Sequence, residues 1–352
     1  MKSDKEVTIY DIAASLGLSP STISRALKDH PGINTETKKQ IKETARKMGY
    51  RYNKFASSLR LKCTNTIGVV VPKLNSYFMA TAITGIEQVA SKHGYNIIIA
   101  NSLEDEKKEA EGITTLFNSR VDGLIVSIAY NTSRMNHFDI FMKKKIPIVF
   151  FDRVFECKGC VRVIIDNFKA GYEVVSHLIS QDCRKIIHVG GNLKRNVYNE
   201  RMLGYRKALE DNGIPYDESL VMIGDLTEKT GEEVVKKILR MKKPPDAVFT
   251  ANDTTAVSVI LNLQKEGISV PHEIAVAGFN NEPISRVIRP NLTTVNYPAY
   301  EVGETAASVL IERLNSRKEV YPTTIILEHS LIIRESSLRN STNVKISRKN
   351  SK

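Results

Sequence analysis

The stretch SPSTISRAL, residues 19–27, decides the fold of the N-terminal part of the chain. Ser19 can cap a helix, and Pro20 suits the first helical turn. Ile23 and Leu27 lie one turn apart and form an apolar seam. The opposite face carries small polar side chains beside a single arginine, namely Ser21, Ser24 and Arg25. We therefore expect a helix over 20–28 whose exposed face can come close to a negatively charged surface.

The residues on either side of this helix predict two more helices. Thr8 and Asp11 have the spacing of a capping box, which starts a helix over about 8–16. Gly17 is a plausible stop for it, so the connection to the next helix is only three residues long. A third helix follows from a cap at Asn34. Three short helices with one tight connection are typical of a helix-turn-helix module.

The positive charge of the chain is concentrated at its N-terminus. Residues 1–62 hold thirteen Lys and Arg against six Asp and Glu, out of a net charge of +12 for the whole chain. The segment 341–352 adds four basic residues and no acids, and we expect it to be a disordered tail. A basic surface on a helix-turn-helix favours DNA binding over an ordinary three-helix bundle with a solvated Arg25.

The segment NKFASSLRLK, residues 53–62, contains no Gly or Pro but is too short to be a stable helix alone. It makes sense as a hinge helix that folds only on DNA, with Leu59 inserted between base pairs in the minor groove. A flexible linker is the alternative.

Apolar strands alternate with amphipathic helices from Thr66 onward, which predicts an α/β body. The strands are TIGVVV, YNIIIA, GLIVSI, PIVFF, VRVII, KIIHVGG, DAVFTA and EIAVAGF. Most are continuous apolar runs, as in parallel sheets covered by helices on both faces. Eight strands before residue 280 suit two doubly wound lobes better than one large sheet.

Several function classes lack support in the sequence. Nucleotide-binding and hydrolase motifs are absent, and the seven histidines show no metal-ligand spacing, so we expect no catalytic site, cofactor or metal. Cys157 and Cys160 form a lone CxxC, which we interpret as reduced thiols in a surface loop. No signal peptide or membrane span is evident, and we expect a cytoplasmic protein.

Polar side chains follow several of the body strands. Ligands of open α/β folds bind at the carboxyl ends of strands, so these side chains are candidates for a binding site. They are the aromatic pair Tyr77 and Phe78, the charged residues Asp152, Arg153, Arg195, Arg201 and Asp253, and the amides Asn252, Asn280 and Asn281. Planar Arg, Asn and Asp groups bind hydroxyls and carboxylates through paired hydrogen bonds.

Three stretches resemble the lactose-repressor and purine-repressor (LacI/GalR) family of transcription regulators. They are VTIYDIAASLGLSPSTISRAL, GINTETKKQI, and ASSLR followed by TNTIGVVVP, and the resemblance runs to about residue 340. It implies a recognition helix at 20–28 and a leucine wedge at Leu59. The DNA-binding residues it implies are Thr8, Ser19, Pro20, Ser21, Thr22, Ser24, Arg25, Asn34, Tyr50, Asn53, Ala56, Leu59 and Arg60.

The resemblance also implies a body like that of periplasmic sugar-binding proteins, with the effector between its lobes. The effector-binding residues it implies are Tyr77, Phe78, Asp152, Arg153, Ile165, Arg195, Arg201, Asn252, Asp253 and Asn280. The expected domains are 1–52 for DNA binding, 53–62 for the hinge, 63–340 for the body and 341–352 for the tail. Lobe one should comprise about 66–164 and 293–325, and lobe two about 165–292 and 326–340, with crossings near 164, 292 and 325.

Asn280 stands where many sugar-binding members of the family have an aspartate. The absence of this aspartate, together with the presence of Arg153, Arg195 and Arg201, favours an anionic effector such as a sugar acid or sugar phosphate over a neutral sugar. The expected partners are a pseudo-palindromic operator DNA, this carbohydrate-type effector and a second copy of the chain. The rival functions are a sugar-binding receptor and a sugar-metabolising enzyme, each without DNA binding.

Overall fold

The computed structural model describes residues 7–50, 63–155, 157, 159–316 and 322–339. The chain divides into two compact units, Met1–Thr64 and Asn65–Lys352. The expected hinge helix at 53–62 and the expected tail at 341–352 both lie outside the described residues.

The first unit contains the three expected helices, α1 (Ile9–Leu16), α2 (Pro20–Leu27) and α3 (Thr35–Lys47). Each begins at the predicted cap, because Thr8, Ser19 and Asn34 all accept a backbone hydrogen bond from the first turn of their helix. Gly17 ends α1 with a φ of 64°, which favours glycine. The small core is formed by Ile12, Ala13, Ile23, Ala26, Ile41 and Ala45. The helix-turn-helix prediction is therefore confirmed.

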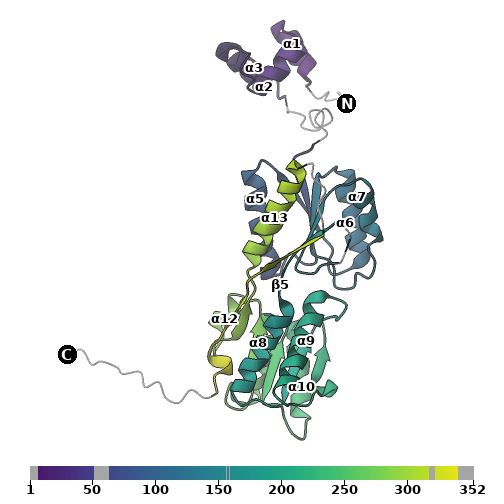
Figure 1. Ribbon diagram of the computed structural model, residues 1–352. Coiled ribbons are helices and arrows are strands. Elements are labelled where there is room, and N and C mark those ends of the chain that lie inside the picture. The colour runs from purple at the N-terminus through teal and green to yellow at the C-terminus, as the bar shows by residue number, and fades with distance from the viewer. Residues whose placement is uncertain (1–6, 51–62, 156, 158, 317–321, 340–352) are drawn as a thin grey trace, which may run out of the picture. The chain divides into compact units, whose positions relative to one another are not determined.

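The second unit consists of two α/β lobes (Figure 1). Its strands are β1 (Thr66–Val71), β2 (Asn96–Asn101), β3 (Gly123–Val126), β4 (Ile148–Phe151), β5 (Val161–Ile165), β6 (Ile186–Gly190), β7 (Val221–Ile223), β8 (Ala247–Thr250), β9 (Ala275–Phe279), β10 (Thr293–Asn296), β11 (Thr323–Leu327) and β12 (Ser330–Ile332). Its α-helices are α5 (Tyr77–Lys92), α6 (Glu106–Asn118), α7 (Asp139–Lys143), α8 (Asn167–Ser180), α9 (Asn196–Asp211), α10 (Glu228–Leu239), α11 (Asp253–Lys265), α12 (Ile284–Val287) and α13 (Ala299–Asn315).

Each lobe has one six-stranded sheet. The order is β11-β5-β4-β3-β1-β2 in lobe one and β12-β10-β9-β8-β6-β7 in lobe two. All neighbouring strands are parallel except β10 and β12. The central strands are buried on both faces, as their continuous apolar sequences require. The prediction of two doubly wound parallel sheets is confirmed.

The chain crosses between the lobes three times. The crossings follow β5 at Ile165, β10 at Asn296 and β11 at Leu327. The second crossing lies later than the position expected near 292, because Thr293–Asn296 pairs with β9 and extends the sheet of lobe two. The expected boundary, which gave 293–296 to lobe one, is therefore corrected.

Two smaller expectations also need correction. Cys157 and Cys160 form a disulfide with a Cα–Cα distance of 5.5 Å, so the interpretation as reduced thiols is wrong. This Cα–Cα distance lies within the range that a disulfide requires. Strand β7 is also present before residue 280, although its three residues, Val221–Ile223, are too few to give a clear apolar run.

Candidate nucleic-acid interface and interlobe cleft

Helix α2 presents the exposed face that its sequence predicts. Ser21 and Arg25 are exposed and Ser24 is half-buried, whereas Ile23 and Ala26 are fully buried on the opposite side. Among the described residues, the Arg25 side chain has no hydrogen-bond or ion-pair partner. A free guanidinium beside small side chains can reach a base edge in the major groove.

Other predicted DNA-binding residues of the first unit have structural contacts of their own. The Ser19 hydroxyl accepts from the Thr22 backbone N–H at 3.1 Å, and it lies 2.9 Å from the Thr22 hydroxyl. Thr8 exchanges hydrogen bonds with Asp11, and Asn34 caps α3. Pro20 forms the first turn of α2, and Tyr50 packs against the small core. The predicted residues Asn53, Ala56, Leu59 and Arg60 lie outside the described part of the chain.

A cleft of about 970 Å³ lies between the two lobes of the second unit. It is lined by the segments that follow β1, β2, β3 and β4 in lobe one and β7, β8 and β9 in lobe two, and also by α9. These are carboxyl ends of parallel strands, where α/β folds bind ligands. Seven of the predicted effector residues line it, namely Tyr77, Phe78, Asp152, Arg153, Arg201, Asn252 and Asn280.

The other three predicted effector residues do not line this cleft. Ile165 is fully buried in the apolar core at the end of β5. Asp253 is fully buried in lobe two, where it accepts hydrogen bonds from Thr294 and from the Glu282 backbone N–H. Arg195 is 2 % exposed and donates to the Thr132 carbonyl across the lobes. Strand-end position alone does not show whether a side chain faces the cleft or the interior of its own lobe.

The two arginines of the cleft have different surroundings. Arg153 forms a salt bridge with Glu104 at 2.6 Å and donates to the Tyr198 hydroxyl at 2.9 Å. Arg201 donates to the Asn167 amide oxygen at 2.9 Å and to the Ala251 carbonyl at 2.8 Å, and its pKa is lowered by burial. The positive charge of Arg153 is therefore already compensated, whereas that of Arg201 is held by neutral acceptors.

Asp152 supplies a buried carboxylate at the end of β4. Its side chain accepts a long hydrogen bond of 3.3 Å from the Ser127 hydroxyl, and burial raises its pKa. Its φ of 56° turns the chain from the strand into the cleft. The carboxylate is thus held in the cleft wall with few hydrogen-bond donors.

Several hydrogen bonds join the lobes beside the cleft. The Tyr130 hydroxyl donates to the Gly224 carbonyl at 3.1 Å, and the Asn192 amide donates to the Tyr130 carbonyl at 2.8 Å. The Asn196 amide donates to the Asp152 carbonyl at 3.0 Å. These contacts join residues of both lobes, so a ligand that changes the lobe angle must change them.

Sequence reasoning missed several polar residues of the cleft wall. Among them are Glu104, Tyr130, Tyr198, Asp225 and Glu282. Glu104, Tyr130 and Glu282 follow β2, β3 and β9 by a few residues, so the strand-end rule applied to every predicted strand would have found them. Asp225 follows β7, which is too short to be recognised in the sequence. Tyr198 lies on α9 one turn before Arg201, which is a helical spacing.

The described residues give no sign of a metal site or a membrane span. No group of three or more His, Cys, Asp or Glu in the described ranges could hold a metal ion. No helix among the described residues is long and apolar enough to cross a membrane.

Comparison with known proteins gives matches to both units. Residues 8–53 match the family of bacterial regulatory proteins of the lacI type, and residues 175–337 match a periplasmic binding protein-like domain. The chain is 36 % identical over 333 residues to the transcriptional regulator RegA of Clostridium acetobutylicum, covering 94 % of this chain and 98 % of the relative.

Two further proteins are similar over nearly the same length. The catabolite control protein A of Priestia megaterium is 33 % identical over 333 residues, covering 94 % of this chain and 99 % of the relative. The solved complex of the transcriptional regulator CelR with cellobiose superposes with a TM-score of 0.71 at 26 % identity, covering 94 % of this chain and all of that chain. The helix-turn-helix, the two-lobed body and these relatives together establish that the chain belongs to the lacI family of bacterial regulatory proteins and is a DNA-binding transcription regulator.

Proposed function

We propose that the protein is a repressor that binds a pseudo-palindromic operator as a homodimer and is controlled by a carbohydrate-type effector in the interlobe cleft. The observation that supports this most is that one chain contains both a DNA-binding part and a ligand-binding part. It has a recognition helix with a free, exposed Arg25, and a body with a polar cleft at the strand ends. CelR, a similar regulator, was solved with a sugar bound.

The DNA-binding part of the proposal rests on α2. Pro20, Ser21 and Arg25 read bases in the major groove, while the remaining polar and basic side chains of the first unit contact phosphates. The segment 53–62, with Leu59 as its minor-groove wedge, completes the DNA-binding part at each half-site. Operator DNA lies in the cytoplasm of a bacterium, so we place the protein there.

Dimerisation is supported by two apolar surfaces on the body. One is at the edge of the lobe-one sheet. There, β2 exposes Ile98 and Ile99, and the loop that follows it exposes Leu103. The other is on lobe two, where α11 and α12 pack together and expose Leu261, Ile284 and Val287. Exposed apolar side chains that gather on one element are typical of protein interfaces. Each recognition helix of a dimer then binds one half of the operator.

The effector acts through the angle between the lobes. A ligand that binds one lobe arrangement better than the other shifts the population toward it, and operator affinity changes by at most that difference in binding free energy. Typical couplings of this kind are about 1–3 kcal/mol.

Selection from a random pool of duplex DNA tests the DNA-binding part directly. The full chain should enrich one sequence made of two inverted half-sites, because a symmetric dimer presents its two recognition helices to inverted repeats. Enrichment of single, unpaired sites would contradict the dimeric mode, and no enrichment at all would contradict sequence-specific binding.

A further inference from the structure

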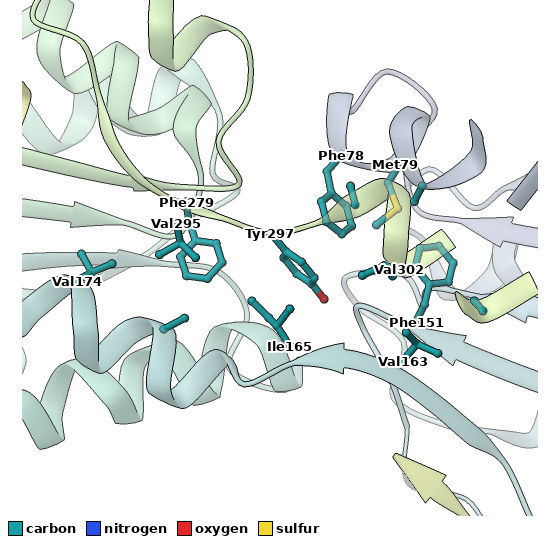
Figure 2. Close-up of a cluster of buried hydrophobic side chains, with 14 of the residues drawn as sticks. Phe78, Met79, Phe151, Val163, Ile165, Val174, Phe279, Val295, Tyr297 and Val302 are labelled. Carbon is teal, nitrogen blue, oxygen red and sulfur yellow. The ribbon is translucent and has the colours of Figure 1, made fainter. Parts of the chain in front are cut away.

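Residues 152–160 form the loop between β4 and β5 of lobe one, and this loop contains the disulfide of Cys157 and Cys160. The strands on either side of it are fixed in the apolar core, where Phe151 at the end of β4 lies beside Val163 of β5 (Figure 2). In the cytoplasm, where we place the protein, thiols keep most cysteines reduced, and the disulfides that do form are mostly transient and redox-sensing. The loop is therefore a candidate for a redox-responsive site.

The first part of this loop contacts the start of α9 in lobe two. The Val154 backbone N–H donates to the Asn196 amide oxygen at 3.0 Å. The Arg195 guanidinium lies over the Phe155 ring, 5.4 Å from its centroid. Arg153, immediately before these two loop residues, also donates to a side chain of α9. Three consecutive residues of the loop thus hold lobe one to the same end of one helix of lobe two.

The last part of the loop is fixed to lobe one. Cys160 is 5 % exposed and packs in an apolar cluster of lobe one, and its backbone N–H donates to the Cys157 carbonyl at 3.3 Å. The Gly159 carbonyl accepts from the Arg313 guanidinium of α13 at 2.9 Å. The disulfide therefore ties Cys157, two residues after Phe155, to a fixed point in lobe one. It shortens the free chain between that point and the contacts with lobe two.

The two cysteines of the disulfide differ in exposure. Cys157 is half-buried, whereas Cys160 is buried. A small thiolate can therefore attack Sγ of Cys157, which breaks the S–S bond and releases the Cys160 thiolate. A second small thiolate then attacks the mixed disulfide and releases the Cys157 thiolate. Two small thiols thus become one small disulfide, and their two electrons and two protons pass to the cysteine pair.

We propose that Cys157 and Cys160 are a site of reversible thiol–disulfide exchange with low-molecular-weight thiols, and that their oxidation state sets the strength of the contacts between residues 153–155 and α9. In the oxidised form the disulfide restrains the loop. In the reduced form more free chain follows Phe155, so the contacts open more often and the lobes change their angle more easily. A low-molecular-weight disulfide reverses the exchange. The inference rests on the proposed function for its cytoplasmic setting and for its effect on operator binding.

The exchange itself is tested on the full chain without DNA or effector. The protein is equilibrated in mixtures of reduced and oxidised glutathione that span the cytosolic range, then quenched with acid, alkylated and digested with trypsin. Cleavage after Arg153, Lys158 and Arg162 gives the peptides VFECK and GCVR, which stay joined only while the disulfide is intact. We expect the joined and the separately alkylated peptides to interconvert within this range. Peptides that stay joined in excess reduced glutathione, or that never join in excess oxidised glutathione, would overturn the proposal.

Hydrogen exchange of the Val154 amide tests the link to lobe two, because this amide donates to Asn196. We expect it to exchange about tenfold faster in the reduced protein, the effect of weakening one hydrogen bond. The Ala129 amide, which is held by a hydrogen bond inside lobe one, is the control and should exchange equally in both forms. The double variant Cys157→Ser/Cys160→Ser should behave like the reduced protein in either buffer. Equal exchange of the Val154 amide in both forms would overturn the link between the disulfide and the lobes.

Operator binding separates this inference from the function on which it rests. We expect the dissociation constant for the selected operator to differ by about fivefold or more between oxidised and reduced wild type. Cys157→Ser/Cys160→Ser should lose this difference, while Cys183→Ala, which removes a buried free thiol of lobe two, should keep it. Equal affinity of the two forms of wild type would overturn the effect of the disulfide on DNA binding. If no operator is selected at all, the proposed function fails, and the first two measurements still decide the exchange.

Discussion

At the scale of single residues, we expect DNA recognition to depend most on the side chain of Arg25. We expect Arg25→Ala to lower operator affinity by about 1–3 kcal/mol, because a bidentate contact to a guanine is worth that much. The variant should also lose its base preference at one position in each half-site. Both effects can be measured by fluorescence anisotropy on the selected operator and on its single-base variants.

Lys39→Ala is the control for this experiment. Lys39 is exposed on α3 of the same unit and carries the same charge, but it does not lie on α2. A phosphate contact affects all sequences equally, so Lys39→Ala should leave base preference unchanged. If Arg25→Ala also weakens all sequences equally, Arg25 contacts only phosphate and the assignment of α2 as the reading helix fails.

His188 is a second residue with a testable effect, in this case on stability. It is fully buried in β6 between Tyr205 and Phe249, and neither ring nitrogen has a hydrogen-bond partner among the described residues. Burial lowers its pKa to about 3, so the folded protein holds it neutral. The unfolded chain binds a proton near the ordinary histidine pKa of about 6.5, and stability is therefore lost as the pH falls from that value toward 3.

We expect His188→Leu to reduce this acid sensitivity. Below about pH 6 the single proton of His188 contributes a slope of about 1.4 kcal/mol per pH unit to the unfolding free energy, and the variant should lack it. Urea unfolding at a series of pH values measures the slope. His93→Leu serves as a comparison, since His93 is exposed at the end of α5. The same pH slope in wild type and His188→Leu would mean that His188 is not held neutral.

At the scale of elements, Asn252 shows that one residue can both line the cleft and hold an element in place. Its amide oxygen caps α11 by accepting from the Thr255 backbone N–H at 3.1 Å, and its amide nitrogen donates to the Leu226 carbonyl at 2.8 Å. We expect Asn252→Ala to lower the unfolding free energy by about 1–2 kcal/mol, the cost of losing a helix cap and a buried hydrogen bond.

Asn252→Asp separates the two contacts. The aspartate keeps an oxygen for the cap of α11 but cannot donate to Leu226, so its stability should lie between those of wild type and Asn252→Ala. Thermal unfolding of the three proteins measures the order. An Asn252→Ala variant as stable as wild type would show that Asn252 serves the ligand alone.

The elements of the structure differ in how well the sequence predicts them. Long apolar runs such as TIGVVV predict strands well, because burial on both faces requires them, and side-chain caps such as Ser19 predict helix starts. Strand β10 was missed because Thr293–Asn296 is short and half polar, and its burial depends on pairing with β9 and β12. Pairing between distant segments is not visible in a local pattern.

The sequence also predicted only part of the candidate site. The rule that ligands bind at strand ends placed Asp152 and Arg201 correctly in the cleft wall. It could not show that Asp253 turns into lobe two, or that Glu104 compensates Arg153, because both depend on side-chain contacts across the fold.

At the scale of the whole molecule, the proposed function requires operator affinity to depend on a ligand in the cleft of the other unit. The coupling requires no contact between effector and DNA, only that the ligand favours one arrangement of the lobes and the operator another. The interlobe hydrogen bonds of Tyr130, Asn192 and Asn196 are the contacts that such a rearrangement would break or remake. Binding of ligand and operator must therefore affect each other by the same factor.

The most direct test of this claim is the dissociation constant of the full chain for its selected operator, measured by anisotropy with and without a saturating amount of the sugar that binds the cleft. We expect a change of about 5- to 150-fold in wild type, which corresponds to a coupling of about 1–3 kcal/mol. An identical dissociation constant in the presence and absence of bound sugar would contradict the claim that the cleft controls DNA binding.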